Sequence, residues 1–170
     1  MKIDIVPVGL LKANCYILTK DDKVIVIDPG DEYEKIYPYI KNKEILKVLV
    51  THYHFDHVGA LTKFDVNQIL PRETPKEYTI GPFNFEVIET KGHTEDSLTY
   101  YFKEENCMFT GDFLFKGSIG RTDFPTGNPE KMKQSLNKII KYRDDITVYP
   151  GHGEKTTIGH EKRTNPFITL

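Results

Sequence analysis

The sequence predicts an α/β fold in which two β-sheets pack face to face and helices cover their outer faces. In each half of the chain, short segments rich in β-branched and aromatic residues are followed by a stretch with helical spacing. A chain of 170 residues with 38% hydrophobic residues buries roughly 68–70% of its unfolded surface, which is enough for a substantial core. Because no linker or low-complexity stretch interrupts the pattern, we expect one domain over residues 1–170.

The first half is expected to contain four strands and two helices. The first three strands are expected at residues 2–9, 14–19 and 23–30. A helix is expected at 33–41, where Pro38 must end or kink it, because proline lacks a backbone donor. The largely apolar segment 45–50 favours a central, buried strand. A short helix is expected over 57–64, and its apolar face would consist of Val58, Leu61 and Phe64.

The second half repeats this order of strands and helices. Its first four strands are expected at residues 77–81, 83–90, 97–102 and 106–111. The clearest helix spans 129–142, because proline suits a first helical turn and the apolar residues that follow have helical spacing. A strand at 146–150 and a closing helix at 156–163 complete the prediction.

Composition, charge and sequence pattern argue against several classes of protein. The formal net charge is −2 and the pI is about 6.3, which argues against a nucleic-acid-binding protein with its basic face. The longest aliphatic run, residues 24–27, is far shorter than the roughly 20 residues that span a bilayer. Asp4 and Pro7 interrupt any signal-peptide core, so we expect a cytoplasmic protein. Cys15 and Cys107 lie in apolar segments, where we expect them to be buried and unpaired.

The chemistry is expected where histidines gather, in the heptapeptide Thr-His-Tyr-His-Phe-Asp-His at 51–57. His52 and His54 are two residues apart at the end of a strand, so their side chains leave on the same side. Asp56 and His57 follow in the loop and can turn back over the strand end. Imidazole and carboxylate groups are ligands for zinc and iron, so the segment predicts a metal site.

Three more potential ligands follow strands elsewhere in the chain. His93, Asp112 and His152 each stand beside a glycine directly after an expected strand. Since strand ends at one edge of a sheet converge in space, we expect these three residues to join the histidine-rich segment.

These motifs resemble those of a known family. The stretches THYHFDHVGA, GHTEDS, TGDFLF and PGHG, in this order, are similar to the metallo-β-lactamase superfamily and within it to the hydroxyacylglutathione hydrolase (glyoxalase II-like) branch. FKGSIGRTDFPTGN and GHEKRTNPF resemble its short single-domain hydrolases. The resemblance implies an αββα four-layer sandwich with the metals at one edge of the two sheets.

The resemblance also implies a two-metal site and its ligands. One ion would be held by His52, His54 and His93, the other by Asp56, His57 and His152, and Asp112 would bridge them. The implied cofactors are two divalent ions, most simply Zn²⁺, although the same ligands accept iron or manganese. The implied reaction is hydrolysis of a small-molecule thioester, such as a hydroxyacyl-glutathione, by a metal-bridging hydroxide that Asp56 orients. No nucleic acid or membrane partner is expected, and the sequence gives no oligomeric state.

Several neighbouring residues have two interpretations each. Asp28 either supports the histidine ligands or is a turn residue, and the Arg121–Asp123 pair either pins its loop or contacts substrate. Tyr53 and Phe55 alternate with the ligands and should point away from them, into the core or the rim. His160 matches no ligand position, so we expect it at the surface or in a supporting hydrogen bond.

The sequence leaves other reactions open. A persulfide dioxygenase resembles the same branch and uses one iron, which would be held by His52, His93 and Asp112. A lactonase on the same scaffold is a further alternative, and a non-enzymatic metal-binding module is another. A β-lactamase of the branch with a cysteine ligand is disfavoured, because Asp112 stands where that cysteine would be.

The length of chain after His152 bears on glutathione binding. In full-length hydroxyacylglutathione hydrolases a helical domain follows the last metal-binding histidine and holds the glutathione. Here 18 residues follow His152, which is too few for a domain with its own core. We therefore expect slow or weakly saturating hydrolysis of lactoyl-glutathione, with other small thioesters accepted to a similar degree.

Overall fold

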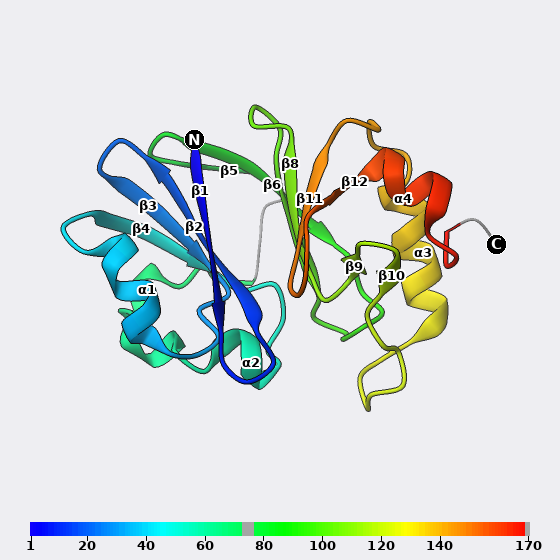
Figure 1. The fold of residues 1–170 in the computed structure, drawn as a ribbon, viewed down its shortest axis with the longest axis horizontal. Helices are drawn as coiled ribbons and strands as arrows, with labels where there is room; N and C mark the ends of the chain where they lie inside the picture. Colours follow the sequence, from blue (N-terminus) through cyan, green and yellow to red (C-terminus); the bar gives the residue numbers. More distant parts are fainter. Residues whose placement is uncertain (73–76, 169–170) are drawn as a thin grey trace.

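The first sheet is built from the N-terminal half of the chain. The computed structural model describes residues 1–72 and 77–168. The strands β1 (Lys2–Val8), β2 (Ala13–Lys20) and β3 (Lys23–Ile27) are antiparallel neighbours, and β4 (Glu44–Leu49) runs parallel to β3. The crossover between β3 and β4 contains α1 (Tyr33–Ile40), which lies against the outer face of this sheet (Figure 1).

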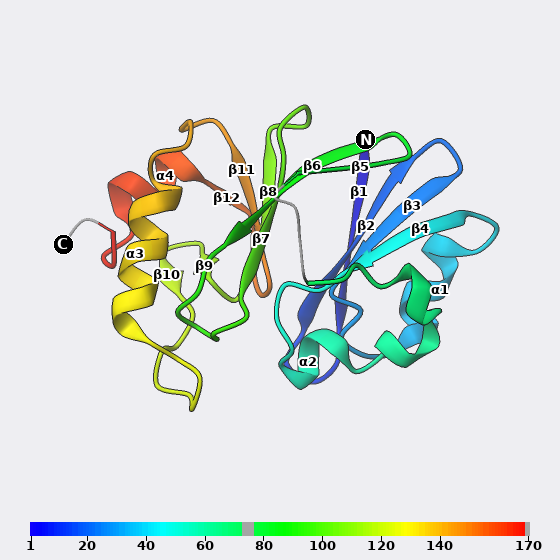
Figure 2. The same ribbon diagram turned by 180° about the vertical axis from the view of Figure 1, so that it is seen from behind.

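The second sheet comes from the C-terminal half. Its strand order is β12-β11-β8-β7-β6-β5. These strands are β5 (Glu77–Ile80), β6 (Phe83–Glu89), β7 (Leu98–Phe102), β8 (Cys107–Gly111), β11 (Thr147–Pro150) and β12 (Thr156–Thr157). A small separate hairpin consists of β9 (Leu114–Phe115) and β10 (Ser118–Ile119). The helices α3 (Pro129–Ile139) and α4 (Ile158–Thr164) cover the outer face of this sheet (Figure 2).

Three apolar clusters hold these layers together. Alternation along β2 explains two of them, since Tyr16 and Leu18 face the second sheet while Cys15 and Ile17 face α1. The cluster between the sheets also receives Phe83, Phe102 and Phe109 from the second sheet. The third cluster packs α3 and α4 against the outer face of β8 and β11 through Met132, Leu136, Ile139 and Ile158. The predicted helix-sheet-sheet-helix sandwich is confirmed.

One strand differs from its prediction. The segment 45–50 was expected to be a central, buried strand, but β4 (Glu44–Leu49) is at the end of the first sheet's strand order and is only partly buried over its first residues. The 3₁₀ turn Val66–Gln68 covers its open side, and Val48 pairs with Ile69 in an isolated bridge. The apolar residues of β4 are therefore covered on this side by a loop and not by a second neighbouring strand.

Helix boundaries also differ from the prediction. The helix expected at 57–64 is instead α2 (Phe55–Val58) followed by a 3₁₀ turn at Leu61–Lys63. The helix at 129–142 ends earlier, at Ile139, and the closing helix begins at Ile158 because the preceding two residues form β12. Pro38 lies inside α1, which ends two residues later, as expected for a proline.

The cysteines are buried and unpaired, as the sequence indicates, with Cys15 facing α1 and Cys107 between the sheets. Within residues 1–72 and 77–168, no helix combines the length and the apolar character that crossing a bilayer requires.

Candidate metal centre

The histidine-rich segment lies directly after β4 and leads into α2. Burial is extreme for two of its side chains, since His52 is 1% exposed and His57 is fully buried. The ring of His52 lies 4.7 Å from that of His54 and 4.3 Å from that of His57, measured between centroids. Asp56 and His57 were expected in a loop, but they belong to the single turn of α2, which directs both side chains back toward the strand end.

The three distant residues join this segment, as the strand-end argument predicts. His93 follows β6, Asp112 follows β8 and His152 follows β11. The Nε2 atom of His93 lies 3.0 Å from Nδ1 of His54. The Nε2 atom of His152 lies 3.1 Å from Oδ2 of Asp56. All seven predicted side chains therefore converge on one edge of the two sheets.

The seven side chains divide into two groups whose ligand atoms lie within 4.8 Å of one another. The first group is His52, His54 and His93, and the second is Asp56, His57, Asp112 and His152. The Asp112 carboxylate lies between the groups. Its Oδ1 is 3.2 Å from His57 Nε2, and its Oδ2 is 3.7 Å from His93 Nε2.

Unpaired polar atoms point to an ion at this position. Nε2 of His52, Nε2 of His57 and Oδ1 of Asp112 are buried and have no hydrogen-bond partner among the described residues. Buried polar groups normally have a hydrogen-bond partner, so three buried atoms without one indicate that the site binds a further species. All are atoms that bind divalent metals, and the two groups can hold a dinuclear metal site.

The second nitrogen of several histidines is fixed by a neighbouring group. Nδ1 of His93 donates to the carbonyl of Arg121 at 2.8 Å, and Nδ1 of His152 donates to the carbonyl of Leu11 at 3.0 Å. A carbonyl oxygen can only accept, so both Nδ1 atoms carry a proton and both Nε2 atoms are turned toward the cluster, as metal-binding nitrogens would be. Sequence analysis missed these contacts, because a backbone carbonyl leaves no signal in a sequence.

Asp28 supports the cluster from behind, which decides between its two interpretations. Its carboxylate accepts hydrogen bonds from the amide and hydroxyl of Thr51, at 2.7 and 2.6 Å, and from Nδ1 of His57 at 2.8 Å. The carboxylate thereby fixes the orientation of the His57 ring and of the backbone just before His52.

Glycine at 151 allows the strand ends to approach. A Cβ atom built on Gly151 would collide with Oδ1 of Asp112 and Cε1 of His57. Any other residue there would push the second group apart, which is the physical reason for a glycine beside His152.

The charges of the metal-free cluster differ between the two groups. Burial lowers the pKa of His52 to about 2. Burial also lowers the pKa of His57, but the carboxylates of Asp28 and Asp112 outweigh it and raise that pKa to about 10. Contacts with Asp112 and Asp56 raise the pKa of His152 to about 9. The second group thus holds protons that an entering cation must displace.

A cavity of about 480 Å³ opens above the cluster. Besides five of the seven cluster residues, its walls are largely apolar and include Leu11, Phe55, Phe115, Ile119 and Phe124. Tyr53 and Phe55 are exposed, so neither belongs to the core, and Phe55 lines this cavity beside the cluster. Arg121 pairs with both carboxylate oxygens of Asp123 at 2.8 Å. His160 lies outside the cluster and is partly exposed, as expected.

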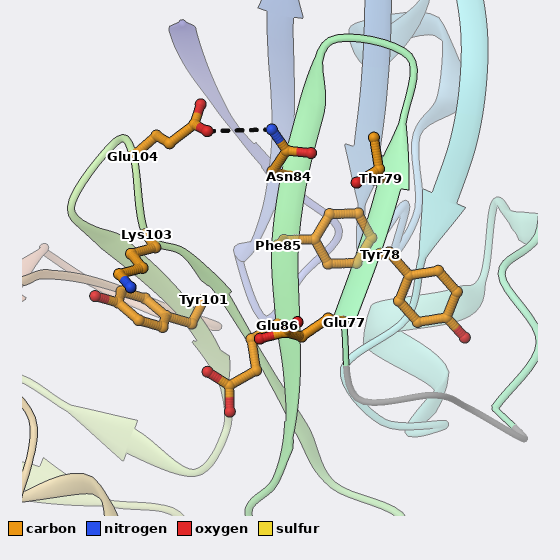
Figure 3. A pocket seen from close by; sticks show the side chains of 9 residues that line it. All are labelled: Glu77, Tyr78, Thr79, Asn84, Phe85, Glu86, Tyr101, Lys103 and Glu104. Carbon is orange, nitrogen blue, oxygen red and sulfur yellow. Dashed lines mark hydrogen bonds between the residues drawn. The ribbon is translucent and has the colours of Figure 1, made fainter.

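A second cavity of similar volume has a different character. It lies over β5, β6 and β7, and Figure 3 shows the carboxylates of Glu77, Glu86 and Glu104 around it, with Lys103 beside them. Its described lining contains no histidine or cysteine.

Comparison with known proteins identifies the family. The family model described as the metallo-beta-lactamase superfamily matches residues 8–79 and 67–152. The chain belongs to this superfamily. It is 35% identical to the "Probable metallo-hydrolase YqgX" of Bacillus subtilis, over 99% of this chain and 98% of that protein. It is also 35% identical to the "Hydroxyacylglutathione hydrolase GloC" of Haemophilus influenzae, with the same coverage. Its relatives in the superfamily thus include proteins named as hydrolases.

Solved structures of the superfamily show the same fold. The crystal structure of the BLEG-1 B3 metallo-beta-lactamase matches with a TM-score of 0.90 and 32% identity, over 99% of this chain and 100% of that chain. TTHA1623 in a di-iron-bound form matches with a TM-score of 0.83 and 31% identity, over 96% and 99%. ETHE1 from Myxococcus xanthus matches with a TM-score of 0.84 and 29% identity, over 98% and 84%.

Proposed function

We propose that this protein hydrolyses small-molecule thioesters at a two-metal centre. In this proposal His52, His54 and His93 hold one ion, Asp56, His57 and His152 hold the other, and Asp112 is shared. The position of Asp112 carries the proposal, because its carboxylate approaches His57 of one group and His93 of the other within 3.7 Å. A shared carboxylate leaves each ion with open positions for water and substrate, which a catalytic site needs and a structural site lacks.

In the proposed reaction the metal ions and Asp56 have different roles. When bound, two divalent ions supply a water of lowered pKa and a positive charge that polarises the substrate carbonyl. Asp56 lies at the mouth side of the cluster, lines the cavity and contacts His152, so its carboxylate is placed to orient that water and to take its proton. Zinc is our first choice of metal, and iron or manganese suits the same donor atoms.

The named relatives support hydrolysis more than any other reaction. YqgX and GloC are both named as hydrolases, and GloC is named for hydroxyacylglutathione. A thioester is therefore our proposed substrate class. The two buried thiols suit a reducing compartment, so we also propose a cytoplasmic location.

A persulfide dioxygenase is the second candidate, because ETHE1 shares the fold at 29% identity. That reaction would use one iron on His52, His93 and Asp112. It would leave the second group, with Asp56, His57 and His152, without an ion of its own, which favours the two-metal interpretation.

Metal content and oxygen consumption separate the candidates. Protein purified from its own host would be analysed for metals, and then assayed for thiol release from thioesters and for oxygen uptake with a persulfide. We expect two ions per chain, thiol release and no oxygen uptake. One iron per chain with oxygen uptake would replace our proposal with the dioxygenase. A lactone and a β-lactam belong in the same assay, the second because BLEG-1 is named a β-lactamase.

A further inference from the structure

Large apolar side chains surround the opening of the catalytic cavity. Leu11 is 55% exposed and Phe55 is 75% exposed, and both line this cavity. Solvent-exposed apolar side chains that gather around one cavity mark a binding surface. The cavity therefore offers hydrocarbon contact to whatever lies over the ligand cluster.

Aromatic rings flank both ligand groups. The Phe124 ring lies 5.2 Å from the His54 ring and 5.6 Å from the His93 ring, which belong to the first group. The Phe115 ring lies 6.2 Å from the His152 ring of the second group. A carbonyl held between the two groups would thus have an apolar surface on each side, one for the acyl part and one for the thiol part.

The positive charges at this opening are already paired with carboxylates. Arg121 is the one lysine or arginine in the described lining. Its guanidinium donates to both oxygens of Asp123 and lies 4.7 Å from the centroid of the Phe124 ring. Lys116, on the neighbouring hairpin, pairs with Glu154 at 2.7 Å. A carboxylate on the substrate would have to compete with these partners.

We infer that the site selects uncharged thioesters with a hydrocarbon chain or ring on the acyl or thiol part, in preference to thioesters of the charged glutathione peptide. The inference rests on the proposed thioester hydrolysis for its reaction, but the binding preference itself concerns only the walls of the cavity. Phe115 and Phe124 are the residues that determine this specificity.

Binding of ligands that cannot be hydrolysed tests the preference without using turnover. Calorimetry on the metal-loaded protein would compare the S-methyl, S-butyl and S-hexyl thioethers of N-acetylcysteamine with S-hexylglutathione. A buried methylene contributes up to about fourfold in affinity. We expect the dissociation constant to fall at least tenfold from methyl to hexyl. We expect S-hexylglutathione to bind no better than the neutral hexyl ligand.

Three variants test whether Phe115 and Phe124 cause the dependence of affinity on chain length. Phe124→Ala and Phe115→Ala should each remove part of the dependence on chain length and together most of it. The matched control is Phe167→Ala, an exposed phenylalanine outside the cavity lining, which should retain the full dependence. Thermal unfolding of each variant checks that it is folded.

A fourth variant tests the charge argument. Asp123→Asn releases Arg121 from its carboxylate partner, so it should tighten binding of S-hexylglutathione and leave the neutral ligands unchanged. An affinity of the wild-type protein that does not depend on the length of the hydrocarbon chain would overturn the inference. A length dependence that persists in the double variant of Phe115 and Phe124 would also overturn it. So would tighter binding of S-hexylglutathione than of the neutral hexyl ligand by the wild-type protein. If the length dependence holds while no thioester is hydrolysed, the preference stands and the proposed reaction fails.

Discussion

Asp112 is the residue on which both ligand groups depend. Its two carboxylate oxygens approach His57 and His152 on one side and His93 on the other. We expect Asp112→Ala to remove most of the bound metal and nearly all activity, measured as metal per chain and turnover. Asp145→Ala, which removes a carboxylate at the exposed Arg143 pair, is the matched control. Two ions per chain in the Asp112 variant would show that this carboxylate does not bridge.

Asp56 is expected to act on the rate more than on metal content. In Asp56→Asn the amide keeps the shape of the side chain, but it carries no charge and cannot accept a proton from water. We therefore expect a modest loss of metal and a fall in kcat of roughly 100-fold or more, the usual range for a lost general base. Turnover within about threefold of wild type, a difference of less than roughly 1 kcal/mol in the barrier, would contradict this role.

Asp28 is expected to control metal affinity from outside the cluster. Its backbone is left-handed, with φ of 51°, a conformation that asparagine also tolerates. Asp28→Asn should therefore keep the turn but weaken the hold on Thr51 and His57. Loss of such a support typically lowers metal affinity by about 10- to 100-fold. Competition with a chelator measures it, with the exposed Asp31→Asn as control, and equal affinities in the two variants would refute the supporting role.

At the scale of elements, one buried carboxylate joins α4 to the hairpin that carries Phe115 and Ile119. Glu161 is fully buried and accepts hydrogen bonds from the Gly117 amide, the Thr156 hydroxyl and the Asn165 amide, at 2.9, 2.6 and 2.8 Å. These donors lose their buried partner in Glu161→Ala.

We expect Glu161→Ala to lower the free energy of unfolding by about 3 kcal/mol. The buried Thr156 hydroxyl loses its partner, which costs about 1–3 kcal/mol, and the hydrogen bonds from Gly117 and Asn165 to Glu161 are lost as well. Urea unfolding of the metal-free protein measures the change. Glu154→Ala, at an exposed glutamate on the same side of the molecule, should leave the midpoint unchanged. Equal midpoints for the two variants would mean that α4 does not depend on Glu161.

Some elements could be predicted from sequence and others could not. The strands of both sheets were found because segments such as 14–19 are rich in β-branched and aromatic residues and are separated by turn residues. The predicted central position of β4 was wrong. An apolar composition indicates that a strand is buried, but it does not indicate whether a second strand or a loop covers it. The short helix begins earlier than predicted, because its one turn spans Phe55–Val58, and Leu61 lies in a separate 3₁₀ turn.

The candidate site also has features that the sequence predicted and features that it could not predict. All seven predicted ligand residues converge, since strand ends and adjacent glycines are visible in the sequence. The carbonyls of Leu11 and Arg121 that orient His152 and His93 could not be predicted, because backbone groups are the same for every residue type. Phe55 was expected in the core or the rim, but the other apolar residues of the cavity were missed, because Leu11 and Phe124 stand in segments that resemble ordinary loops.

At the scale of the whole molecule, the seven proposed ligands come from both halves of the sandwich. The histidine-rich segment follows the first sheet, whereas His93, Asp112 and His152 follow strands of the second. Ions that bind only the folded state should therefore stabilise it, by about 2.7 kcal/mol for each site at a hundredfold excess over its dissociation constant.

Chelation is the measurement that checks this link. We expect a chelator to lower the Tm of the wild-type protein, and added metal to restore it in a concentration-dependent way. Asp112→Ala should show a much smaller shift, since it lacks the shared ligand. A wild-type Tm that is the same with and without chelator would mean that metal does not connect the halves.

The walls of the cavity come mostly from segments that contribute none of the seven side chains of the cluster. Leu11 lies in the turn between β1 and β2, Phe115 and Ile119 lie on the β9–β10 hairpin, and Phe124 lies in the loop that follows. Substitutions in these segments can alter selectivity while the reactive machinery is inherited unchanged. After a gene duplication, a copy of this protein could thus diverge toward new metabolites through a few changes in surface loops, which cost the least in stability.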